Sequence, residues 1–150
     1  MIQRKQTLFL LELMFLGIAL LFVPNSTLLT SSSSVSICLL PLQEPYTSTT
    51  GHYLAMALNF AGLALTVAAV FLYKRRELQL KLCYVLAMLW ALLGFMLGLC
   101  NFVQPGNDVL SVQNNYTGVV ISVFAIAAAL LAARFIRKDI DLLKSADRIR

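Results

Sequence analysis

Few residues in this sequence could carry out chemistry, and they do not cluster. The sharpest anomaly is Glu12, about five residues inside the apolar run TLFLLELMFLGIALLFV. A helix rises 1.5 Å per residue, so this carboxyl would lie roughly 8 Å inside the apolar boundary. An ionisable group at that depth is costly and by default indicates a functional site with a partner. Arg134, at the end of another apolar run, is the partner we expect.

Two interpretations of Glu12 stay open. In the first, Glu12 is structural: it pairs with Arg134 or Lys81, or it stays protonated. In the second, it takes up protons in a small proton-coupled transporter. Small multidrug resistance transporters also have a first-span glutamate, but this chain departs from them in its length, its two sizeable loops and its basic tail.

The remaining reactive residues do not form a known catalytic or metal-binding pattern. His52 is the single histidine, without a nearby cluster of cysteines or carboxylates that would complete a metal site. The sequence contains no nucleophile elbow, zinc-protease or phosphate-loop motif. We therefore expect a protein that is not an enzyme and has no catalytic, cofactor-binding or metal-binding residues. Cys38 and Cys100 could form a disulfide or stay unpaired, and unpaired thiols are the simpler expectation.

The composition indicates whether the helices or strands that position these residues lie in water or in lipid. The chain has 150 residues, of which 59% are hydrophobic and 13% charged. A soluble domain needs about twice that charged fraction. Four apolar runs are each long enough to cross a bilayer as a helix. We expect an all-α membrane protein with a single domain over residues 1–150, a four-transmembrane-helix bundle with spans at about 7–23, 53–73, 82–103 and 118–136.

The positive charges predict the orientation of this bundle. All twelve Lys and Arg residues lie before the first span, around the turn KRRELQLK, or in and after the end of the fourth span. The loops 24–52 and 104–117 contain none. Because positive residues stay cytoplasmic, both termini should be cytoplasmic and both loops external. A cleaved signal peptide is the alternative for the N-terminus, but Glu12 and the poor cleavage site argue against it.

The tail, residues 137–150, is amphipathic when drawn as a helix. We expect it to lie on the anionic inner leaflet or to extend the fourth span into the cytosol against the turn. Together with that turn it would form a basic cytoplasmic face, composed of Lys74, Arg75, Arg76, Arg137, Lys138, Lys144 and Arg148. The partners expected for this face are anionic lipid headgroups of the bilayer, a membrane protein or a second copy of the chain, but not nucleic acid.

Small residues recur at four-residue spacing in the spans and predict close helix packing. The third span contains the G-x-x-x-G pattern of Gly94 and Gly98. The other packing positions are alanines in the second and fourth spans: Ala57, Ala61, Ala125 and Ala129. We expect them to pack within one bundle, with a dimer interface as the alternative.

The external loops contain two β-prone segments, VSICLLPL and DVLSVQ. They could pair into a small β cap or remain irregular, and the sequence does not decide between these outcomes.

Three segments of the chain resemble a known family. The start MIQRKQTLFLL, the centre KRRELQLKLC and the end RFIRKDIDLLKSADRIR are similar to small four-span membrane proteins from Bacteroidota with a domain of unknown function (domain of unknown function 4293). The chain departs from that pattern at Ala133 and Ile140. The resemblance implies a four-span fold in a bacterial inner membrane, with the external loops in the periplasm. It implies no activity.

Overall fold

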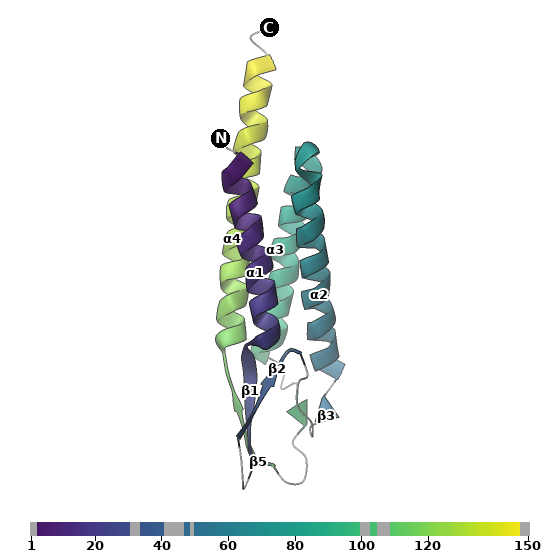
Figure 1. The fold of residues 1–150 in the computed structure, drawn as a ribbon, viewed down its shortest axis with the longest axis vertical. Helices are drawn as coiled ribbons and strands as arrows, with labels where there is room; N and C mark the ends of the chain where they lie inside the picture. Colours follow the sequence, from purple (N-terminus) through teal and green to yellow (C-terminus); the bar gives the residue numbers. More distant parts are fainter. Residues whose placement is uncertain are drawn as a thin grey trace.

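The chain folds into four long helices with a small β-sheet at one end, as the computed structural model shows (Figure 1). The structure describes residues 3–30, 34–40, 47–48, 50–99, 103–104 and 109–147. The helices are α1 (Gln3–Phe22), α2 (Thr50–Phe71), η1 (Leu72–Lys74), α3 (Arg76–Leu99) and α4 (Thr117–Asp147). The strands are β1 (Pro24–Thr30), β2 (Ser34–Cys38), β3 (Thr47–Ser48), β4 (Val103–Gln104) and β5 (Val109–Asn114).

Within the described residues, three helical segments are long and apolar enough to cross a membrane, namely Thr50–Lys74, Arg76–Gly98 and Thr117–Ser145. The apolar part of α1, Gln6–Phe22, is shorter than these three. The helices and their composition suggest a membrane protein.

The helices form a ring in which α1 contacts α2 and α4, and α3 contacts the same two helices. Small side chains let α4 approach its neighbours, since it contributes five buried alanines: Ala125, Ala128, Ala129, Ala132 and Ala133. The fully buried Trp90 of α3 fills the centre. A Cβ added at Gly17 of α1 would come within 2.7 Å of Leu63 Cδ2 and 3.3 Å of the Trp90 ring, so the missing side chain makes room for both residues.

Three buried polar side chains in the helices bond to backbone carbonyls, which satisfies groups that an apolar interior would leave unpaired. Asn59 donates from Nδ2 to the carbonyl of Gly17 at 3.1 Å and links α2 to α1. Thr66 and Ser122 each donate to the carbonyl four residues earlier, at 2.7 and 2.9 Å. These are the interhelical and intrahelical bonds typical of helices in lipid.

A three-stranded antiparallel sheet, in the order β2-β1-β5, covers one end of the helices. Strands β2 and β5 lie within or beside the two β-prone loop segments, but they do not pair with each other. Each pairs with β1, with Thr27 opposite Ser36 on one side and Gln113 on the other. We did not expect a strand at PNSTLLT, so the central strand of the sheet is a correction to the sequence analysis.

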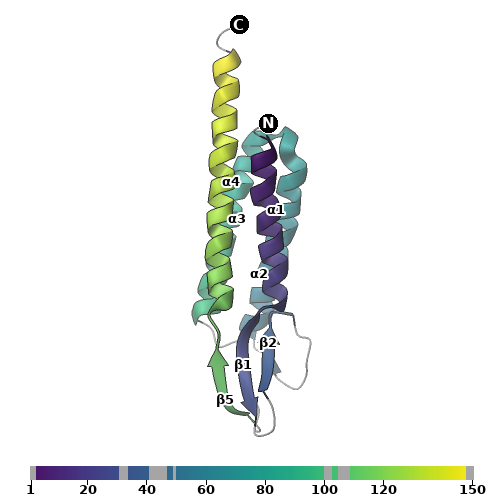
Figure 2. The same ribbon diagram turned by 60° about the vertical axis from the view of Figure 1, so that its left-hand side comes forward.

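The sheet continues the helices almost without a loop. Only Val23 separates α1 from β1, and two residues separate β5 from α4. Thr117 donates from Oγ1 to the carbonyl of Pro24 at 3.0 Å, and the Asn115 amide donates to the carbonyl of Asn25 at 2.8 Å. The neighbouring helices α1 and α4 therefore pass directly into the neighbouring strands β1 and β5 (Figure 2).

The basic tail does not form a separate helix. As far as Asp147 it is the last part of α4, which projects beyond the ends of the other helices (Figure 2). Of the two arrangements expected for the tail, the structure has the one in which the fourth helix simply extends.

Candidate functional site

The charged end of the molecule lies opposite the sheet and is built around a tight turn. The short helix η1 ends where the Arg75 amide donates to the carbonyl of Leu72 at 2.9 Å. The amide of Gln79 then donates to the Arg75 carbonyl at 3.0 Å and opens α3. Lys74, Arg75 and Arg76 thus lie at the tip of the α2–α3 pair, directly after the apolar helix α2 and the residues Leu72 and Tyr73. We call this region the basic end, and it also includes the last part of α4.

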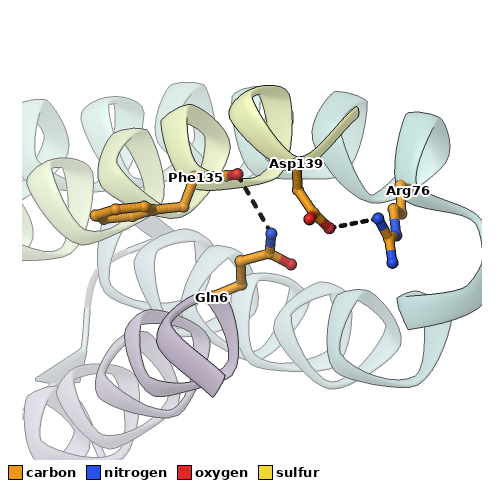
Figure 3. A network of polar contacts seen from close by, with 4 residues as sticks. All are labelled: Gln6, Arg76, Phe135 and Asp139. Carbon is orange, nitrogen blue, oxygen red and sulfur yellow. Dashed lines mark hydrogen bonds and ion pairs between the residues drawn. The ribbon is translucent and has the colours of Figure 1, made fainter. Parts of the chain in front are cut away.

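Two side chains hold the turn in place. The buried Gln79 donates from Nε2 to the carbonyl of Ala69 at 3.1 Å, which ties the start of α3 to the end of α2. Arg76 forms an ion pair with Asp139 of α4, with 2.5 Å between Nη1 and Oδ2 (Figure 3). The side chains are only 23% and 11% exposed. This contact fixes the projecting part of α4 against the turn.

The N-terminal part of α1 is fixed to the same stretch of α4. Gln6 is buried and donates from Nε2 to the carbonyl of Phe135 at 3.3 Å (Figure 3). The rings of Phe9 and Phe135 stack with 5.4 Å between their centroids. Gln6 and Phe135 consequently mark the same depth on two antiparallel helices.

A cavity of about 610 Å³ opens between the turn and α4. Its volume is in the range of small-molecule sites. It is lined by four cations, one carboxylate and three apolar side chains: Lys74, Arg75, Arg76, Lys144, Glu77, Leu78, Ile140 and Leu143. We call it the basic cavity. The arrangement can bind an anion and, beside it, an apolar group.

The residues predicted for the basic face fall into two groups. Lys74, Arg75, Arg76 and Lys144 line the basic cavity, whereas Arg137 and Lys138 are exposed on α4 and do not line it. Arg148 lies outside the described residues.

Glu12 and Arg134 lie on contacting helices but do not form an ion pair. Both side chains are exposed, and among the described residues the ion pair at this end joins Arg76 to Asp139. The reason is that the two residues lie at different heights along the helices. The contact between Gln6 and Phe135 fixes the height of α1 relative to α4. Glu12 lies six residues beyond Gln6, so it is about 8 Å from Arg134 along the helix axes.

The small residues differ in what surrounds them. A Cβ at Gly94 would come within 3.0 Å of the Ser122 Cβ, whereas at Gly98 it would meet Val119 Cγ2 at an ordinary 3.8 Å. Helices α3 and α4 therefore approach closely at Gly94 and not at Gly98, which is exposed. Ala125 and Ala129 are buried in the bundle. Ala57 and Ala61 of α2 are exposed and do not pack in the interior of the bundle.

His52 and the cysteines do not build a reactive centre in the described part of the chain. His52 is buried at the sheet end, edge-on to the Tyr53 ring with 6.1 Å between centroids. Cys38 is free, its thiol lies 3.0 Å from the carbonyl oxygen of Phe22, and burial raises its pKa. Cys100 lies outside the described residues. No group of three or more His, Cys, Asp or Glu residues that could bind a metal occurs within the described ranges.

Sequence reasoning missed Asp139 and its bond to Arg76. A signal was nevertheless present, because the buried positions of α4 recur at alternating spacings of four and three residues: Ala125, Ala129, Ala132, Ile136 and Asp139. An acidic residue that continues a buried stripe needs a cationic partner from the neighbouring helix.

Comparison with known proteins identifies a family for the chain but no function. No curated protein and no solved structure shows a significant similarity to it. The sequence profile of one family, described as a domain of unknown function (DUF4293), matches residues 2–149. Since this match covers almost the whole chain, the protein belongs to the DUF4293 family.

Proposed function

We propose that this protein is a four-span protein of the bacterial inner membrane, with both termini cytoplasmic and no enzymatic activity. Its role is structural or partner-binding, and its basic end is the contact surface. The observation that carries this proposal is the separation of charge: most of the described Lys and Arg residues belong to the turn between α2 and α3, the start of α3 and the last part of α4, which lie away from the sheet (Figure 1). The segments 24–52 and 104–117, to which the three strands of the sheet belong, contain no Lys or Arg.

The fourth span in this proposal is α1. Its apolar part, Gln6–Phe22, has 17 residues, at the lower limit of a membrane-spanning helix. It contacts α4 and α2, both of which are long enough to cross the bilayer. A helix that is shorter than its neighbours can span when the bilayer thins locally or flanking residues reach the interface.

The contact surface is the basic end because the two segments that contain its cations, the turn and the last part of α4, are held against each other. The ion pair between Arg76 and Asp139 and the bond from Gln79 to Ala69 determine where the turn and α4 stand. Such a surface attracts anionic groups, either lipid headgroups of the inner leaflet or acidic patches on a membrane protein. Glu12 does not line the basic cavity, so we do not adopt the transporter as the function of this site.

Topology reporters test the orientation directly. We expect a reporter fused after the last residue to read cytoplasmic, and reporters inserted at residues 33 and 106 to read external, because of the charge bias. Reporters at both ends of the chain control for the fusion itself, since the N-terminus should also read cytoplasmic. An external C-terminus would overturn the proposal.

A further inference from the structure

We propose that the basic cavity binds the phosphate headgroup of one anionic phospholipid, with the first part of an acyl chain against its apolar wall. The inference rests on the proposed membrane insertion and names the ligand of the same surface. It assigns a single bound molecule to a defined site, which differs from the general attraction of a basic protein to an anionic bilayer.

The first argument is the balance of charge in the cavity. Four cations line it against one carboxylate, Glu77. Arg76 is occupied by Asp139, whereas Lys74, Arg75 and Lys144 have no ion-pair partner within the part of the chain that the structure describes. Like charges held close together repel, and a phosphate placed between them removes that cost. Arg and Lys are the side chains that bind phosphate most strongly.

The second argument is the depth of the cavity. The cations of the turn follow directly on the apolar helix α2, and the exposed rings of Phe71 and Tyr73 precede them. Tyrosines gather at the level of lipid headgroups because the ring is apolar and its hydroxyl is polar. Lys74 lies over the Tyr73 ring, 5.9 Å from its centroid, so the cation and the ring share this level. The cavity is therefore placed at the height of lipid phosphates.

The third argument is the apolar part of the lining. Leu78 and Leu143 are 42% and 49% exposed, and Ile140 packs beside them against the core. A free phosphate or a polar phosphate ester has nothing to bury against these side chains. A lipid has both parts, since its phosphate meets the cations and its methylenes cover the leucines. Basic pockets between membrane helices bind anionic lipid headgroups in this way.

The test uses the purified full chain, stripped of lipid, in a neutral detergent. Its unfolding midpoint is measured while short-chain phosphatidylglycerol is added, with short-chain phosphatidylcholine as the neutral comparison. A ligand that binds the folded state raises the midpoint as its concentration rises. We expect phosphatidylglycerol to raise the midpoint and phosphatidylcholine to leave it unchanged. Equal effects of the two lipids would overturn the inference.

Two double variants separate a built site from diffuse attraction. Arg75→Gln with Lys144→Gln removes two cations of the cavity, and Arg137→Gln with Lys138→Gln removes two exposed cations of the same end that do not line it. We expect the first to raise the phosphatidylglycerol concentration needed for half of the effect about tenfold, and the second to leave it nearly unchanged. Equal weakening by both would overturn the site. Lys144→Gln alone, near the end of α4, is the variant to use if the double one does not fold.

Further arms identify the source of the phosphate. Glycerol phosphate, which has the headgroup chemistry without acyl chains, should have little effect at the same concentrations. Leu143→Ser should weaken the lipid effect, whereas Leu142→Ser, also exposed but outside the cavity, should not. If glycerol phosphate equals the lipid, or an acidic peptide displaces it at lower concentration, the lipid assignment fails. The topology reporters give the same reading in either case, so failure of this inference is distinct from failure of the proposed function.

Discussion

Glu12 lies on the outer surface of α1, among exposed apolar side chains such as Leu8, Leu11 and Phe15. In a bilayer this surface faces lipid unless another protein covers it. A carboxyl facing lipid has a large desolvation cost in its charged form, and intramembrane acids accordingly face the interior of a bundle in most proteins. Glu12 therefore either lowers the stability of the folded protein or contacts a partner outside this chain.

We predict that Glu12→Leu raises the stability of the protein in lipid nanodiscs by roughly 1–2 kcal/mol, because it removes a polar group from the lipid surface. The measurement is thermal unfolding, with Phe15→Leu on the same surface as a control that should change little. A loss of stability on Glu12→Leu would instead indicate a covering partner. Proton-coupled uptake that disappears in a fully stable Glu12→Gln variant would favour the transporter interpretation.

Arg76 and Asp139 behave differently, because they touch and are largely shielded from water. We predict that Arg76→Leu destabilises the protein by roughly 1–3 kcal/mol, since it leaves the Asp139 carboxylate without its cation. Adding Asp139→Leu should recover part of that loss. A double-mutant cycle on unfolding in neutral detergent measures the coupling.

The matched control for this cycle is Glu12 with Arg134. Their separation along the helix axes, which the contact between Gln6 and Phe135 sets, predicts a coupling energy near zero. Additive effects at Arg76 and Asp139 would mean that the ion pair contributes nothing specific.

These two pairs also show what sequence reasoning can do with charged residues. It recognised that Glu12 needs an explanation, but it could not tell that Gln6 and Phe135 lie at one level, which sets the offset. The depth of a residue in its own helix follows from counting, whereas the relative height of two helices depends on packing.

The elements differ in how well local sequence predicts them. Helices α2, α3 and α4 follow from long apolar runs. Helix α2 begins and ends within three residues of the expected run 53–73, whereas α3 begins six residues before the expected run 82–103, and α4 continues past the expected run 118–136 as far as Asp147. Strand β1 was not expected, because PNSTLLT has the composition of a polar loop. It is a strand because partners on both sides, β2 and β5, satisfy its backbone groups.

The junction between β1 and α4 depends on a glycine. A Cβ at Gly118 would collide with the side-chain oxygen of Asn25 and come within 3.2 Å of Leu97. We predict that Gly118→Ala destabilises the protein by about 2 kcal/mol, because the crowded site must shift. Gly98→Ala is the matched control and should be nearly neutral, since a Cβ there makes only an ordinary contact with Val119. Unfolding midpoints of the two variants in one detergent test this, and equal midpoints would contradict it.

Over the whole molecule, charge and hydropathy predicted which ends of the helices lie together. In the structure, the turn between α2 and α3 and the last part of α4, which contain most of the described Lys and Arg residues, indeed lie away from the sheet (Figure 1). They did not predict the order of the strands or the cavity between the turn and α4. Both depend on contacts between residues far apart in the chain, such as Thr27 with Gln113 and Arg76 with Asp139. The helical periodicity of single segments has no information about such contacts.

The direct passage of α1 into β1 and of β5 into α4 also bears on how the chain is assembled during synthesis. Strand β1 is made early, but its partner β5 comes after the whole of α2 and α3. Until then, β2 can cover one edge of β1 while the other keeps its backbone groups unpaired. Contacts between distant segments form late, because the intervening chain must first be ordered. Closure of the sheet is therefore a late step: it can occur only after β5 has been made, which follows α3 in the chain. Until then, an unfinished chain presents an open strand edge that chaperones and proteases can recognise.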